Sequence, residues 1–205
     1  MISNKKIRLI EAWKTNPFAG FGIAEIMNLS GKKTKPWVFN ALKQLTKNKL
    51  LLSKRKGNLD IYSLNMNNPF LLQTLQYLEA QNCLGFPHLD VVMETINNIP
   101  VKNHCLLVFG SYAENKQTKE SDLDICFLIE SRQTEKKIKP YFNDIKLSHK
   151  ISIDEHYIIF ADFAKMLVRG EENLAKQIFR KHILFYNADI YYQLIKEANR
   201  HGFSP

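Results

Sequence analysis

The stretch CLLVFGSYAENKQTKESDLDICFLI, residues 105–129, contains two apolar runs separated by a glycine-serine step and a polar spacer. Each run has the length of a buried strand, and the first ends at Gly110 and Ser111. The second begins with an Asp-Leu-Asp sequence. Because successive side chains of a strand point to opposite faces, we expect Asp122 and Asp124 to project from the same side, near the start of the strand.

The aspartate pair and the glycine-serine step favour one kind of chemistry. Two carboxylates held this close repel each other unless a cation lies between them, and Mg²⁺ prefers such oxygen ligands together with substrate phosphates. Gly110 would let the backbone approach a phosphate group, and Ser111 would supply a hydroxyl and an N–H group at the start of a short helix. A metal site beside a phosphate cradle predicts chemistry on a nucleoside triphosphate.

The segments FGSYA, residues 109–113, and SDLDI, residues 121–125, resemble the signature of the DNA polymerase β-like nucleotidyltransferase superfamily. The closest resemblance is to its small minimal nucleotidyltransferases. It covers about residues 88–165 and continues more loosely through the C-terminal helices. The resemblance implies transfer of a nucleoside monophosphate from a nucleoside triphosphate, ATP in the first place, to an acceptor with release of pyrophosphate. A protein hydroxyl, a small molecule and a nucleic-acid end all remain open as acceptors.

The same resemblance assigns roles to individual residues. Asp122 and Asp124 would hold two Mg²⁺ ions, while Gly110, Ser111 and Ser121 would bind the nucleotide. In such enzymes a third carboxylate from a neighbouring strand joins the metal site and assists deprotonation of the acceptor hydroxyl.

The third carboxylate is expected in ISIDEHYI, residues 151–158, which has the composition of a strand. Asp154 is the predicted ligand because it follows the apolar start of this strand, and His156 would share its face. Glu155 would point the other way and is the alternative. We therefore expect Asp122, Asp124 and Asp154 to be both the metal ligands and the catalytic residues.

Two positions depart from the family pattern. Glu114 stands where relatives often have a basic residue, which removes one phosphate contact. Asn115 stands where glycine is usual, but asparagine tolerates left-handed backbone, so the turn can be kept.

Charge is unevenly distributed along the chain. The formal net charge is +9, yet residues 1–65 hold 13 Lys and Arg against 3 acids, a net of +10, and residues 66–205 have a net of −1. Such asymmetry is typical of a basic nucleic-acid-binding module joined to a near-neutral domain, although a solvated lysine-rich surface gives the same numbers.

The basic part also has a recognisable order of elements. Apolar residues recur at helical spacing in residues 5–14, in a short segment that ends at Gly31, and in residues 38–45. A hairpin with its turn at residues 56–58 follows. Three short helices and a hairpin with a basic tip resemble a winged helix-turn-helix domain.

In winged helices the third helix enters the major groove and the wing touches the DNA backbone. Carried over to this chain, the resemblance places the following side chains on nucleic acid: Asn40, Lys43, Gln44 and Lys47 from the helix, and Lys54, Arg55 and Lys56 from the wing. DNA is the favoured partner and RNA remains open. A protein-interaction or dimerisation domain is the alternative.

These observations predict an α/β (α+β) protein in three parts. Residues 1–66 would form the winged helix-turn-helix domain, and residues 67–100 a helical connector. Residues 101–205 would form the nucleotidyltransferase domain, with a short mixed sheet and C-terminal helices.

A cytoplasmic location is expected. No apolar stretch reaches the ~18–20 residues of a membrane span, so no membrane partner is predicted. The N-terminus lacks an apolar signal core. The widely spaced cysteines are typical of reduced core residues: Cys83, Cys105 and Cys126.

Two other functions fit the same sequence. The chain could be a DNA-binding regulator whose second domain senses nucleotide or binds a partner. It could also be an antitoxin-like modifier of a companion toxin. The expected partners are therefore a nucleoside triphosphate and nucleic acid. A companion protein or a second copy of the chain is a further possible partner.

Overall fold

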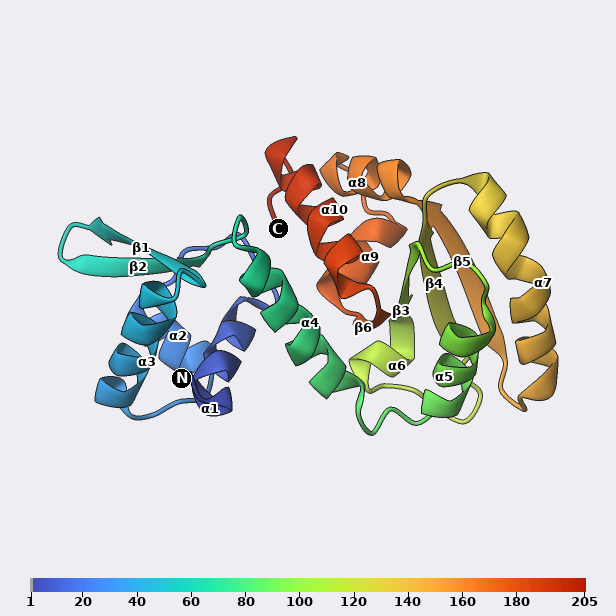
Figure 1. The fold of residues 1–205 in the computed structure, drawn as a ribbon, viewed down its shortest axis with the longest axis horizontal. Coiled ribbons are helices and arrows are strands. Elements are labelled where there is room, and N and C mark those ends of the chain that lie inside the picture. Colours follow the sequence, from blue (N-terminus) through green and yellow to red (C-terminus); the bar gives the residue numbers. More distant parts are fainter. Residues whose placement is uncertain (1) are drawn as a thin grey trace. The chain divides into compact units, whose positions relative to one another are not determined.

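The computed structural model describes residues 2–205, which form two compact units. The first unit comprises the chain through Leu78 together with Ser204 and Pro205, and the second runs from Glu79 to Phe203. The division falls inside helix α4, Pro69–Cys83, one of the elements labelled in Figure 1.

The first unit begins with short helical segments packed around an apolar centre. In chain order these are α1, Asn4–Ile7; the 3₁₀ helix η1, Arg8–Trp13; α2, Ile23–Leu29; and α3, Lys35–Lys47. The 3₁₀ helix, α2 and α3 contribute apolar side chains to the interior, whereas α1 has no buried residue. The largest buried side chains include Trp13, Ile26, Leu42 and Leu45. The helical periodicity of residues 38–45 is thereby confirmed.

A β-hairpin follows α3. Strands β1, Leu51–Lys56, and β2, Leu59–Leu64, pair antiparallel. Gly57, at φ +60°, occupies the turn, where left-handed backbone favours glycine. An isolated antiparallel bridge joins Phe21 to Tyr62 and ties the segment before α2 to the hairpin.

The second unit is built on a four-stranded mixed sheet in the order β5-β4-β3-β6. Strands β4 and β5 are parallel, and β3 is antiparallel to both β4 and β6. The bounds are His104–Val108 for β3, Leu123–Ile129 for β4, Ile153–Ile159 for β5 and Ile183–Tyr186 for β6. The predicted α+β architecture with a short mixed sheet is confirmed.

Helices cover both faces of this sheet, as Figure 1 shows for α7 on one side and α8 to α10 on the other. Helix α7, Arg132–Ser148, is the crossover that parallel strands β4 and β5 require. The remaining helices are α5, Leu89–Asn98; α6, Gly110–Glu114; α8, Phe160–Val168; α9, Leu174–Arg180; and α10, Ala188–Arg200.

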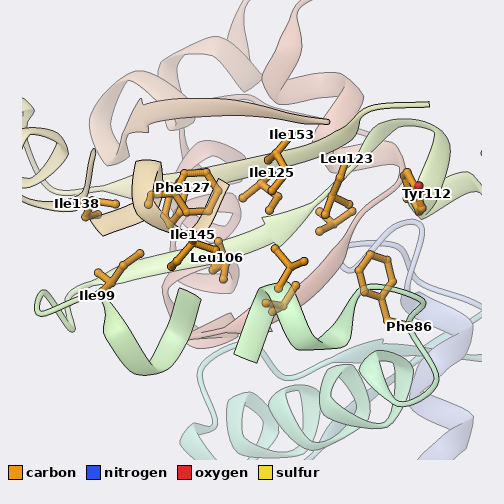
Figure 2. Packing of buried hydrophobic residues seen from close by; sticks show 14 of the residues in the cluster. Phe86, Ile99, Leu106, Tyr112, Leu123, Ile125, Phe127, Ile138, Ile145 and Ile153 are labelled. Atoms are coloured by element: carbon orange, nitrogen blue, oxygen red, sulfur yellow. The ribbon is translucent and has the colours of Figure 1, made fainter. Parts of the chain in front are cut away.

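The sheet alternates its side chains between two cores. Leu123, Ile125 and Phe127 of β4 join Val92 of α5 and Phe142 of α7 in one apolar cluster, part of which is drawn in Figure 2. On the opposite face, α8 packs against β4 and β5, and α10 packs against β3. Only even-numbered residues of β4, starting with Asp124, face this second layer.

Strand β6 lies between α9 and α10, where the sequence pattern predicted no strand. Its four residues, Ile183–Tyr186, are too few for periodicity to separate a strand from a buried helical turn. Antiparallel pairing with β3 shows that these residues form a strand.

The cysteines lie in the interior, as expected. Cys83, Cys105 and Cys126 are all buried and free of disulfide bonds. None of the helices formed by residues 2–205 is long and apolar enough to cross a membrane.

Candidate active site

The register of β4 and β5 brings Asp124 and Asp154 together. The two residues are direct partners in the parallel pair, and the Leu123 N–H group donates to the Ser152 carbonyl at 2.8 Å just beside them. Partners in register project to the same face of a sheet, so both carboxylates lie on the side that α8 and α10 cover. They stand where β4 and β5 begin.

His156 completes a three-residue cluster. One carboxylate oxygen each from Asp124 and Asp154 and one ring nitrogen of His156 lie within 4.8 Å of one another. The Nε2 atom of His156 is 3.1 Å from Oδ2 of Asp154. Two carboxylates and an imidazole form a donor set that suits a divalent cation.

Gly110 is packed directly against this cluster. Its φ is +66°, and a Cβ atom there would lie 1.9 Å from Oδ2 of Asp124. The preceding Phe109 N–H group donates to the Asp124 carbonyl at 3.1 Å, which fixes the approach of the two segments. Glycine is therefore required here by the left-handed backbone and by the carboxylate itself.

Helix α6 carries Ser111 beside Gly110, half-buried in the first turn. It ends at Asn115, whose φ of +57° is left-handed, so the asparagine keeps the turn that the sequence indicated. Glu114 forms an exposed ion pair with Lys116 at 2.8 Å. Ser111 therefore directly follows the glycine that packs against Asp124, while Glu114 faces solvent.

The electrostatics of the cluster favour a cation. Burial is the largest influence on Asp124 and raises the pKa of its carboxyl group, and the negative charge of Asp154 raises that pKa further. Asp122 adds a smaller increase, and His156 opposes these by lowering the pKa. Burial and the neighbouring negative charges disfavour the ionised form of Asp124. A bound cation would stabilise that ionised form.

Asp122 lies just before β4, exposed to solvent and outside the three-residue cluster. Its negative charge is the smallest of the causes that raise the pKa of Asp124, after burial and the charge of Asp154. Ser121 precedes it in a tight loop, where its Oγ accepts a hydrogen bond from the Thr118 N–H group at 2.9 Å. Ser121 also lines a polar pocket of about 410 Å³ with Tyr112 and Lys150 among its other walls.

Glu155 occupies the other face of β5. Its carboxylate pairs with Lys146 of α7, on the side of the sheet away from Asp124. Of the two candidates for the third carboxylate, the tertiary structure places Asp154 with Asp124 and engages Glu155 elsewhere.

The residues singled out for nucleic-acid binding all belong to the first unit and are all exposed: Asn40, Lys43, Gln44, Lys47, Lys54, Arg55 and Lys56. Gln44 accepts a hydrogen bond from Lys6 Nζ at 3.0 Å. A pocket of about 460 Å³ between α3 and the hairpin has Lys43, Lys47 and Tyr62 among its lining residues. These side chains are not part of the carboxylate cluster.

His156 is the site residue whose role the sequence did not indicate. The two-residue period of a strand placed it on the face of Asp154, but only the pairing of β5 with β4 brings its ring to the carboxylates. A histidine two residues after a candidate ligand on the same strand is the signal that could have found it.

Comparison with known proteins bears on the second unit. Residues 94–191 match a family described as polymerase beta, nucleotidyltransferase, and this segment contains every residue from Gly110 to His156. The match supports the nucleotidyltransferase resemblance and nucleotidyl transfer as the general class of reaction. No curated protein and no solved structure matches the chain.

Proposed function

We propose that the second unit transfers a nucleoside monophosphate from a nucleoside triphosphate, ATP in the first place, to an acceptor and releases pyrophosphate. One observation carries the proposal: Asp124 and Asp154 stand in register on parallel strands, with Gly110 packed against Asp124, inside the segment that matches the nucleotidyltransferase family. The acceptor is a nucleophilic group such as a hydroxyl, because displacement at the α-phosphate requires one.

The carboxylates have distinct places in this reaction. Asp122, Asp124 and Asp154 would hold two Mg²⁺ ions, which, when bound, neutralise charge on the phosphates and favour an ionised acceptor oxygen. Asp154, whose side chain is open to solvent over 58% of its surface and so is accessible to an acceptor, would assist deprotonation of the acceptor hydroxyl. Asp124, more enclosed, would hold the cation that neutralises charge on the reacting phosphate.

The Gly110-Ser111 step binds the phosphates. The absence of a side chain on Gly110 leaves room for the Asp124 carboxylate, and Ser111 presents a hydroxyl and an N–H group in the first turn of α6. Ser121 holds the loop before Asp122 through Thr118 and takes part in nucleotide binding from that loop.

We further propose that the first unit binds nucleic acid, with DNA as the first ligand to test. Its net charge of +10 and the exposure of its predicted contact residues on α3 and β1 support this partner. Nucleotidyl transfer to the acceptor, or contact with a companion protein, would then take place while the first unit is bound to nucleic acid.

The test of the transferase is incubation of the full chain with Mg²⁺, each α-labelled nucleoside triphosphate and a cell extract. We expect label to pass to an acceptor, and to be lost in Asp122→Asn combined with Asp124→Asn. Asp144→Asn, an exposed aspartate on α7, is the matched control and should retain transfer. Transfer that survives the double substitution would overturn the proposed site, and nucleotide binding without transfer would favour the regulator.

A further inference from the structure

His156 is held in one orientation beside the carboxylates. Its Nε2 atom stands 3.1 Å from Oδ2 of Asp154, and its ring lies edge-on to Phe109 with centroids 5.3 Å apart and an interplanar angle of 64°. The side chain remains accessible over 31% of its surface. The imidazole therefore presents a nitrogen to the carboxylates while one side of the residue stays open.

Nε2 of His156 and Oδ2 of Asp154 form a hydrogen bond in the structure, and their spacing is also that of two ligands sharing one ion. Adjacent ligands of an octahedral cation bound at about 2.0–2.2 Å stand about 3 Å apart, as geometry requires. The Nε2–Oδ2 separation of 3.1 Å agrees with that value, and an oxygen of Asp124 lies within 4.8 Å of both atoms. The three donors therefore face one another across a space in which a single cation would be their shared partner.

The kind of donor then bears on the identity of the cation. Mg²⁺ favours an all-oxygen shell, whereas imidazole nitrogen suits transition-metal ions, of which Mn²⁺ also accepts carboxylates. A cation position with two carboxylates and one imidazole should therefore favour a transition-metal ion more than a position with carboxylates alone does.

We propose that His156 is a ligand of the cation held by Asp124 and Asp154, so that this position selects Mn²⁺ over Mg²⁺. The inference rests on the proposed function for the existence of a cation at these carboxylates. Asp122, which lies outside the cluster, serves the other cation, whose remaining ligands are phosphate oxygens and water. The two cation positions are therefore chemically unequal.

The test uses Mn²⁺ on the full chain, followed by electron paramagnetic resonance. Bound Mn²⁺ should show electron spin-echo modulation from a directly coordinated ¹⁴N nucleus. His156→Gln should remove this modulation and weaken Mn²⁺ binding by about 10–100-fold or more, because loss of even an outer-shell partner of a metal ligand costs that much. Mg²⁺ binding, measured by competition with Mn²⁺, should change less than about threefold, because oxygen ligands dominate it.

His201→Gln is the matched control, since His201 lies in the same unit but is exposed and paired with Glu197. It should leave the ¹⁴N modulation and both affinities unchanged. Bound Mn²⁺ without ¹⁴N modulation in the unaltered chain would overturn the proposal, and so would equal losses of Mn²⁺ and Mg²⁺ binding in His156→Gln.

Failure of this inference is distinguishable from failure of the proposed function. Nucleotidyl transfer with Mg²⁺ but no ¹⁴N modulation would refute ligation by His156 and leave the transferase intact. Modulation that disappears in Asp124→Asn, with no transfer to any acceptor, would uphold the ligand and refute the transferase. Absence of any Mn²⁺ binding would refute the ligand directly.

Discussion

A side chain at position 110 is incompatible with the present place of Asp124, since even a methyl group would come within 1.9 Å of its carboxylate oxygen. The two residues belong to different elements, α6 and β4, and meet because Phe109 is hydrogen-bonded to the Asp124 backbone. At the scale of single residues, the position of the Asp124 carboxylate therefore depends on the absence of a side chain at Gly110 as well as on the carboxylate itself.

Gly110→Ala should therefore damage both the fold and the site. The left-handed backbone costs about 1–2 kcal/mol for a residue with a Cβ atom, and displacement of Asp124 weakens divalent-cation binding in addition. Urea denaturation and Mn²⁺ titration measure the two effects. Gly57→Ala is the matched control: its φ is +60° but its Cβ would meet nothing within 4 Å, so stability should fall while cation binding stays normal. Normal cation binding in Gly110→Ala would contradict the argument.

Asp124 should be unfavourable for stability in the absence of cations. Burial and the charge of Asp154 raise its pKa in the folded chain above the value of 3.8 expected when unfolded. The folded state therefore holds the proton more tightly, and ionisation of this group at neutral pH lowers the free energy of unfolding.

Asp124→Asn should accordingly raise the midpoint of denaturation at pH 7 in the presence of a chelator. The advantage should shrink as the pH falls through the raised pKa and vanish below about 3.8, where the carboxyl is protonated in both states. Denaturation curves across this range provide the measurement. A variant less stable than the parent at pH 7 would show that Asp124 stabilises the fold instead.

At the scale of elements, α3 combines two faces with separate uses. Val38, Leu42 and Leu45 are fully buried on one face, and Lys43 and Lys47 are exposed on the other. The buried face is a consequence of helical periodicity, which the sequence displays directly. The exposed, basic face of α3 can contribute to binding only when a negatively charged ligand contacts it.

Lys43→Ala combined with Lys47→Ala should weaken binding to duplex DNA and make it less salt-dependent. Each lost phosphate contact removes about one unit from the slope of log affinity against log salt. Fluorescence anisotropy at several salt concentrations measures both quantities. Lys136→Ala with Lys137→Ala, exposed on α7 in the second unit, changes the net charge equally and should have no effect. Binding that ignores salt, or that survives the α3 substitutions, would refute the contact model.

At the scale of the whole molecule, charge and chemistry divide between the two units. The excess of basic residues lies in the first unit, and the cluster of Asp124, Asp154 and His156 lies in the second. Each compact unit carries its own apolar core, so each set of functional residues is supported locally.

We therefore expect the two activities to be separable by substitution. Asp124→Asn should weaken cation binding at the position formed with Asp154 and His156 and leave DNA affinity within about twofold of the parent, because phosphate contacts dominate that affinity. Lys43→Ala with Lys47→Ala should have the reverse pattern. Parallel anisotropy and Mn²⁺ titrations on the same preparations provide the comparison. Loss of both activities in either variant would show that the units depend on each other.

Much of this organisation follows from local patterns. The helices of the first unit, its hairpin turn at Gly57 and the strands that flank Gly110 are all visible as short periodicities and turn residues, since a few neighbouring residues specify them. The candidate carboxylates were recognisable for the same reason, because they lie next to the runs that become β4 and β5.

The sequence by itself determined where the basic charge lies, which segments are buried, and that Asp122, Asp124 and Asp154 lie at or just before the start of a strand. Only the tertiary structure decided that Asp154, and not Glu155, faces Asp124, that His156 joins them, and that Ile183–Tyr186 forms an edge strand. The physical reason is that hydrogen bonding between strands distant in the chain sets their register, and a shift of one residue would turn every side chain to the other face.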